Sequence, residues 1–129
     1  MRYLLLIYEA EPTQDVPEDA IAAEFAAYGE FTRDIRERGI FQAGEALHAT
    51  SSATTVRVED GQTVTTDGPF AETKEALGGF YLIDAKDLDE AIELAARIPA
   101  AKHGSIEIRP ILEVPAGDMS QTEAVGAGS

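Results

Sequence analysis

The apolar run RYLLLIY, residues 2–8, constrains the fold more than any other segment of the chain. Charge and proline end the run between Glu9 and Pro12. It is therefore too short for a secretory signal or for a membrane-spanning helix, which takes about 20 apolar residues. A short, almost unbroken apolar run is typical of a β-strand that is covered on both faces. We expect residues 2–8 to form the central strand of a sheet in a cytoplasmic protein.

Two longer segments carry the period of an amphipathic helix. The first has apolar residues at steps of three and four, namely Ile21, Phe25, Tyr28, Phe31 and Ile35. Asp15, three residues before Glu18, predicts a capped start for this helix, and Gly39 predicts its end. The second has an inner stripe of Leu88, Ala91, Ile92 and Ala95. Asp87 is its predicted N-cap, and Pro99 predicts its end.

A β-hairpin is predicted in the middle of the chain. Residues 54–59 and 62–66 are rich in β-forming side chains and flank Asp60 and Gly61. An Asp-Gly pair in this position favours a type I′ turn, because both central residues of that turn need positive φ.

The hairpin set aside, the predicted order is strand, helix, strand, strand, helix, strand. The other strands are expected at residues 40–48, at residues 79–85, and in SIEIRPILEV from Ser105. In the first of these, a glycine suggests a bulge or a close backbone approach. In the last, apolar and charged residues alternate, as in a half-buried strand. This order is the ferredoxin-like α+β pattern of split βαβ units. Both helices would cover one face of the sheet. Because the other apolar face also needs cover, we expect a homodimer whose two sheets form a barrel-like core.

Composition limits the class of protein. The 129 residues suit one domain, which we expect over residues 1–114, followed by a disordered tail over residues 115–129. A formal net charge of -14 at pH 7 argues against nucleic acid or an anionic membrane as partner. Without cysteine the chain has no disulfide, thiolate metal site or catalytic thiol. No redox-cofactor motif occurs, so no cofactor is expected.

An acidic loop offers the best candidate site. Asp67 precedes a Gly-Pro bend, which we expect Phe70 to anchor in the core, and Glu72 and Glu75 flank Lys74. Carboxylates beside an amine can transfer protons if burial shifts their pKa values. We take Asp67, Glu72 and Glu75 as candidate catalytic residues and Lys74 as a candidate ligand-binding residue. A solvated charged turn is the alternative.

Two histidines and one arginine complete the candidates. His103 is either a surface residue or a general acid or base near a dimer cleft. His48 stands three residues after Glu45, but odd offsets on a strand point to opposite faces, so we expect no metal site at either histidine. Arg109 either forms a salt bridge, to Glu107 or to the acidic loop, or clamps the carboxylate or phosphate of an anionic ligand.

The segment TDGPFAETKEALGGFYLIDAKDLDEAIELAARIP, followed by GSIEIRPI, resembles the YCII-related (YciI-like) superfamily, and within it the DGPF branch named for residues 67–70. YLLLIY at the start, GEAL after the first helix and ATTVR at the hairpin extend the resemblance over most of the chain. The resemblance implies a dimeric ferredoxin-like α+β barrel. It also implies a small enzyme or ligand-binding protein without a settled reaction, of a kind often encoded beside extracytoplasmic-function sigma factors.

For the smaller YciI-type members, the family pattern implies a catalytic couple of a histidine in the first helix and an aspartate before a proline after the second helix. Here the first helix has no histidine and Ile98 precedes Pro99, so that couple is not carried over.

Two hypotheses about the function follow from the sequence. One is a polar pocket that binds a small anionic organic ligand and does acid-base chemistry. The other is a non-enzymatic accessory protein that acts on a sigma factor through its acidic surface.

Overall fold

The computed structural model describes residues 1–115, and its centre is a four-stranded sheet. The strands are β1 (Arg2–Glu9), β2 (Phe41–Ala46), β5 (Ala76–Asp84) and β6 (Ser105–Pro110), in the order β2-β5-β1-β6. All neighbours in this sheet are antiparallel. Because β1 pairs with β5 on one side and β6 on the other, the prediction of a central strand at residues 2–8 is confirmed.

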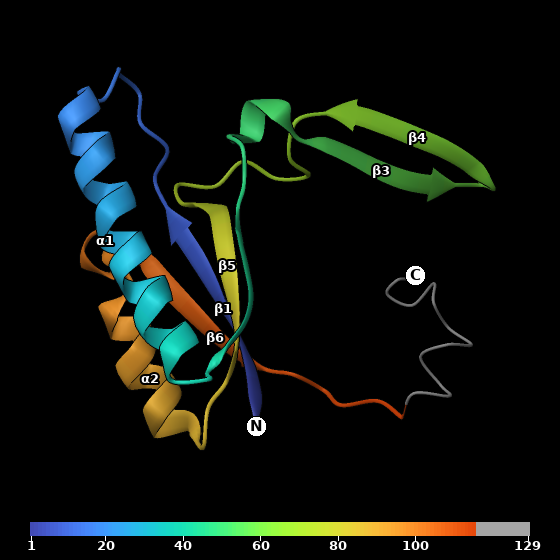
Figure 1. Cartoon of the computed structure of the whole chain (residues 1–129). Coiled ribbons are helices and arrows are strands. Elements are labelled where there is room, and N and C mark those ends of the chain that lie inside the picture. The colour runs from blue at the N-terminus through green and yellow to red at the C-terminus, as the bar shows by residue number, and fades with distance from the viewer. Residues whose placement is uncertain (116–129) are drawn as a thin grey trace.

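Two helices, α1 (Glu18–Glu37) and α2 (Leu88–Arg97), lie on one face of the sheet (Figure 1). With the hairpin set aside, the chain runs βαββαβ, so the ferredoxin-like α+β fold is confirmed. Neither helix within residues 1–115 has the length and apolar character needed to cross a membrane. The predicted tail lies, from residue 116 on, outside the described residues.

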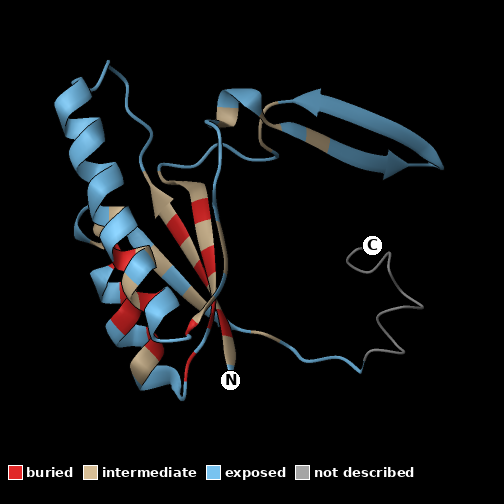
Figure 2. Cartoon of the chain, in the orientation of Figure 1, coloured by how far each residue is buried: buried red, intermediate tan, exposed pale blue. Residues whose placement is uncertain are grey.

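The core fills the space between the sheet and the helices. Every second residue of β1 from Tyr3 to Ile7 is buried, while the residues between them are half-buried on the other face. Tyr81 and Ile83 of β5 follow the same alternation. Figure 2 shows the buried residues gathered where the strands meet α2 and the later half of α1. Each large side chain buried there contributes about 1.5–3 kcal/mol.

The first half of α1 departs from the predicted pattern. Phe31 is only 3% exposed, but Ile21 is 42% and Phe25 is 70% exposed. Figure 1 shows α1 leaning away from the strands toward its N-terminal end, so these early apolar residues do not reach the core. The predicted cap at Asp15 is wrong, because Pro17 occupies the N-cap position and no side chain caps the helix.

The start of α2 is as predicted, but its buried stripe is not. The Asp87 carboxylate accepts a hydrogen bond from the Glu90 N–H at 2.9 Å, which caps the helix. The buried residues of α2 are Ala91, Leu94 and Ala95. Leu88 and Ile92 are about half exposed, so their placement in the inner stripe is wrong. The helix packs on the sheet through Ala91, Leu94 and Ala95, which leaves Leu88 and Ile92 at the rim of this contact.

The predicted hairpin is confirmed. Strands β3 (Thr54–Glu59) and β4 (Gln62–Asp67) pair antiparallel, and both turn residues have positive φ, 50° at Asp60 and 77° at Gly61. The hairpin projects from the body of the molecule (Figure 1), and its residues are almost all exposed (Figure 2).

The Gly-Pro bend is tied to the base of this hairpin. The Gly68 N–H donates to the Ala53 carbonyl at 2.7 Å, and the Thr55 hydroxyl donates to the Gly68 carbonyl at 2.8 Å. Phe70 is 79% exposed. The prediction that Phe70 anchors the bend in the core is therefore wrong, because the bend is fixed by hydrogen bonds to the start of the hairpin, away from the four-stranded sheet.

Strand β2 is shorter than the predicted residues 40–48, and β5 starts before the predicted residue 79. The pairing register shifts between Phe41 and Ala43. Gly44 gives the predicted close approach, since a Cβ there would lie 2.9 Å from the ring of Tyr81. The ring of Tyr81 packs edge-on against Phe31 and Phe41, with centroid distances of 5.3 and 6.2 Å.

Candidate functional site

A groove of about 1250 Å³ runs between α1 and the sheet, with lining residues along the helix from Ala20 to Arg36. It exists because α1 leans away from the strands, which leaves the early apolar residues of the helix facing open space. Its apolar walls include Ile7, Phe25, Tyr28, Phe41, Leu47 and Tyr81. Small-molecule sites are usually concave and mostly apolar, with volumes of about 300–1,000 Å³ and a few convergent polar groups. The groove has this character and is somewhat larger.

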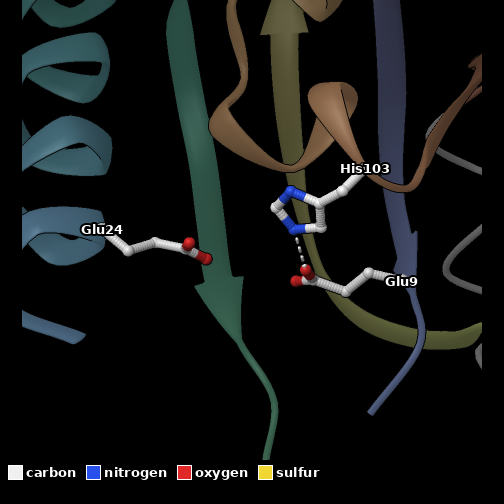
Figure 3. A group of neighbouring side chains, drawn as sticks. All are labelled: Glu9, Glu24 and His103. Atoms are coloured by element: carbon white, nitrogen blue, oxygen red, sulfur yellow. Dashed lines mark hydrogen bonds and ion pairs between the residues drawn. The ribbon is translucent and has the colours of Figure 1, made fainter. Parts of the chain in front are cut away.

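At one end of the groove three polar side chains from three segments converge (Figure 3). Glu9 ends β1, Glu24 lies on α1, and His103 follows the short 3-10 helix η2 (Pro99–Lys102). The His103 Nε2 atom lies 2.8 Å from Glu9 Oε1 in a hydrogen bond. One ligand atom from each of the three residues lies within 4.8 Å of the others. The side chain of Glu9 is 28% exposed and that of His103 54%, so the pair is open to a ligand in the groove.

Gly104 explains why His103 reaches Glu9. A Cβ atom at this position would clash with the Tyr8 carbonyl oxygen and crowd the side chain of Glu9. The N–H groups of His103 and Gly104 both donate to the Ala100 carbonyl, which closes the turn. A residue without a side chain thus lets this turn press against the end of β1 and sets the imidazole beside the carboxylate.

Two phenols lie near this polar end. Burial, together with the charges of Glu9 and Glu24, raises the pKa of Tyr28 to about 12. The hydroxyl of Tyr81 is 2.7 Å from the hydroxyl of Thr32, and burial raises the pKa of Tyr81 as well. Both phenols are protonated at neutral pH, as ordinary tyrosines are, and the Tyr28 hydroxyl can offer a hydrogen bond to a ligand oxygen.

Carboxylates dominate the charged lining of the groove. They belong to Glu9, Glu11, Glu24, Glu45 and Glu72. Among the lining residues that the structure describes, Arg36 has the one guanidinium, which lies 4.3 Å from the centre of the Phe41 ring. The N–H and hydroxyl of Thr50 donate to Glu11 and hold the pKa of that carboxyl below its ordinary value. The charged lining of the groove therefore favours an uncharged or cationic ligand over an anion.

The structure brings two of the predicted site residues to this groove, Glu72 and His103. Glu75 is held elsewhere, since its Oε1 atom accepts a hydrogen bond from the Ser105 hydroxyl at 3.1 Å. The acidic loop therefore does not gather its carboxylates around one point.

The remaining predicted residues do not line the groove. Asp67 ends β4 opposite Thr54, and Lys74 is exposed in the connection to β5. Arg109 is exposed opposite Leu4, on the sheet face turned away from the helices. Within residues 1–115 neither Lys74 nor Arg109 forms an ion pair, so the salt bridge considered for Arg109 is not formed.

Sequence patterns did not single out Glu9, Glu24 or Tyr28 as site residues. A signal for two of them exists, because Glu24, Tyr28, Thr32 and Arg36 recur at steps of four and all line the groove. Such spacing puts polar side chains on one face of a helix. Glu9 has no local signal, since its partner His103 is 94 positions away.

A ferredoxin-like sheet covered on one face by two helices, with a groove beneath the first of them, defines a small α+β domain. The chain belongs to the YCII-related family, whose domain model matches residues 1–115. The predicted superfamily is confirmed, while membership of the DGPF branch stays a prediction.

A curated relative comes from Rhizobium meliloti (strain 1021). It is an uncharacterized protein that is 47% identical to this chain over 75 residues, which are 57% of this chain. The match spans 60% of the length of that relative.

Among solved structures, the fold is similar to that of 5-chloro-2-hydroxyhydroquinone dehydrochlorinase from Burkholderia phenoliruptrix AC1100, solved in complex with 2,5-dihydroxybenzoquinone. The TM-score is 0.52 over 88% of this chain and 96% of the dehydrochlorinase chain. At 13% sequence identity, this likeness concerns the fold alone.

Proposed function

We propose that the groove binds a small organic molecule and that His103, paired with Glu9, transfers a proton to or from it. The observation that carries this proposal is the 2.8 Å hydrogen bond between His103 Nε2 and Glu9 Oε1 at the polar end of an apolar-walled groove. A carboxylate orients an imidazole and stabilises its charged form, which is the usual arrangement of a general acid or base.

Each polar group at this end has a role in the proposal. His103 exchanges the proton, Glu9 positions the imidazole, and the Tyr28 hydroxyl donates a hydrogen bond to a ligand oxygen. Glu72 remains a second candidate carboxylate, because it lines the same groove. The reaction class is isomerisation, elimination or hydrolysis, which all need proton transfer at one carbon or oxygen.

The ligand we propose differs from the anion expected from the sequence. Lys74 and Arg109, the expected anion clamp, lie outside the groove lining, and the lining carries mainly carboxylates. An uncharged cyclic molecule suits the aromatic walls. The dehydrochlorinase of similar fold was solved with a cyclic molecule, 2,5-dihydroxybenzoquinone, which supports this size class.

A thermal-shift screen of small metabolites tests the proposal, since a ligand that binds only the folded state raises the melting temperature. We expect a hit whose shift is lost in Glu9→Gln, His103→Asn and Tyr28→Phe. Glu93→Gln, an exposed carboxylate change on α2, should retain the shift. A complete absence of hits, or a hit indifferent to all three groove variants, would contradict the proposal. If a hit is also a substrate, the His103→Asn variant should no longer convert it.

We also propose a homodimer through the sheet face turned away from the helices, formed by a single domain over residues 1–114. Half-buried apolar residues line that face, namely Leu4, Leu6, Phe80 and Leu82. Glu107 and Arg109 of β6 lie at its edge with opposite charges. A two-fold axis can set Glu107 of one protomer against Arg109 of the other, which makes the face complementary to itself.

An accessory role toward an extracytoplasmic-function sigma factor is the second candidate. It is supported by the formal net charge of -14, which suits a basic partner surface. A pull-down with a sigma factor encoded nearby should then weaken with salt. The ligand-binding role and the sigma-factor role both assume a cytoplasmic location, which fractionation of the source cells would test.

A further inference from the structure

The polar end of the groove carries a set of ligand atoms that proton transfer alone does not explain. Glu24 reaches from α1 toward the pair formed by Glu9 and His103, although it makes no hydrogen bond to either (Figure 3). Two carboxylates and one imidazole, supplied by a strand, a helix and a loop, thus surround one point on the groove wall.

The distances suit a single ion. Zinc binds imidazole nitrogen and carboxylate oxygen at about 2.0–2.2 Å, so two ligand atoms of one tetrahedral ion lie roughly 3.4 Å apart. His103 Nε2 and Glu9 Oε1 are 2.8 Å apart in a hydrogen bond, and they would separate by about half an ångström to hold an ion. All three ligand atoms lie within 4.8 Å of one another. Glu24 is exposed on the helix, so its side chain has room to rotate toward the other two.

Basic side chains are scarce around these two carboxylates. Glu9 has only His103 as an ion-pair partner, and Glu24 has none within the described residues. Most carboxylates in residues 1–115 also have no ion pair, so what distinguishes Glu9 and Glu24 is that they converge. Like charges that converge without a cation destabilise each other, and a divalent cation between them removes the repulsion.

We propose that Glu9, Glu24 and His103 form a binding site for a divalent transition-metal ion. A mixed nitrogen and oxygen ligand set favours zinc, cobalt, nickel or manganese over magnesium or calcium, which prefer oxygen alone. Three protein ligands leave coordination positions free for water or for a molecule in the groove.

This inference goes beyond the proposed function, because the ion needs no organic ligand. A bound metal ion would take the place of the proton between Glu9 and His103. The metal-loaded chain could therefore not use this pair for proton transfer. Either proposal can therefore fail without the other.

The test is a Zn²⁺ titration of the full chain, followed by calorimetry and by NMR of the imidazole nitrogens. The chain has only two histidines, so His103→Asn and His48→Asn assign both signals. We expect one ion per chain and a shift of the His103 signals, while those of His48 stay in place. His103→Asn and Glu24→Gln should each weaken Zn²⁺ binding by about tenfold or more. Even the loss of a residue that only hydrogen-bonds to a metal ligand lowers metal affinity by about 10–100-fold.

Matched controls come from the same groove. His48→Asn and Glu45→Gln change the same residue types on the groove lining and should leave the affinity for Zn²⁺ unchanged. Glu24→Gln, on an exposed helix position, keeps the test valid even if His103→Asn does not fold. The proposal is overturned if millimolar Zn²⁺ does not shift the His103 signals, or if Glu24→Gln binds the ion as tightly as the native chain.

Discussion

At the scale of single residues, a glycine decides where the histidine lies. Gly104 packs so close to the Tyr8 carbonyl oxygen that no larger residue fits without movement of the backbone. The neighbouring His103 depends on this contact for its hydrogen bond to Glu9. A residue that carries no chemistry therefore positions the group that does.

Gly104→Ala should destabilise the fold by about 1–3 kcal/mol, the usual cost of overpacking. Urea unfolding measures this loss. Gly29→Ala is the control, because Gly29 lies inside α1 with open space around it. There alanine should stabilise by about 0.5–1 kcal/mol, since glycine loses more backbone entropy in a helix. Equal stability of Gly104→Ala and the native chain would show that the contact is not tight.

Tyr28 predicts a pH dependence at high pH. Its pKa is about 12 in the folded chain against an ordinary value of 10.0. The unfolded chain therefore loses this proton first as pH rises, so the stabilisation is complete below the ordinary value and is lost as pH rises through the folded value. Absorbance titration should show that Tyr28 and Tyr81 ionise later than an ordinary tyrosine, and Tyr28→Phe should remove the latest phase. Survival of the latest phase in this variant would assign the shift to another tyrosine.

At the scale of elements, α1 has two halves with different tasks. The later half carries Phe31 and Ile35, which are buried in the core. The earlier half carries Ile21 and Phe25, which are exposed toward the groove. One continuous apolar stripe thus serves the core at one end and a candidate ligand site at the other.

Phe31→Ala should cost about 3–5 kcal/mol of unfolding free energy, the usual cost of emptying a buried aromatic site. Phe25→Ala should change it by less than about 0.5 kcal/mol, as exposed substitutions do. Thermal and urea unfolding of both variants compare them directly. A large loss in Phe25→Ala would mean that the first half of α1 packs more closely than the groove allows, and that the ligand site is smaller.

At the scale of the whole molecule, the sheet has one covered and one uncovered face. The helices bury the face that carries Tyr3, Leu5 and Ile7, while Leu4 and Leu6 stay half-buried on the other. An apolar sheet face of this kind is a typical interface between copies of a chain.

Leu6→Glu should abolish the proposed dimer, because Leu6 pairs with Phe80 and Glu107 at the middle of that face. Light scattering after gel filtration would give the mass in solution. Val58→Glu makes the same chemical change on the projecting hairpin, where Val58 is 70% exposed, and should leave the dimer intact. If Val58→Glu dissociates the protein and Leu6→Glu does not, the hairpin rather than the sheet forms the interface.

Local chemistry made some elements predictable. The turn at Asp60 and Gly61 and the cap at Asp87 were both found from short patterns, because each depends on residues a few positions apart. Predictions about depth of burial were less reliable. Phe70, Ile92 and Leu88 were expected inside and are exposed, because burial depends on which elements pack together.

The candidate site was predicted only in part for the same reason. Glu72 and His103 line the groove, but the polar cluster depends on Glu9 and Glu24, which come from distant segments. The order of periodic segments, the hairpin and the family were determined by the sequence alone, since neighbours along the chain encode them. The lean of α1, the groove beneath it and the meeting of three ligand residues were decided by the tertiary structure, because side chains from separate elements become neighbours only when those elements pack.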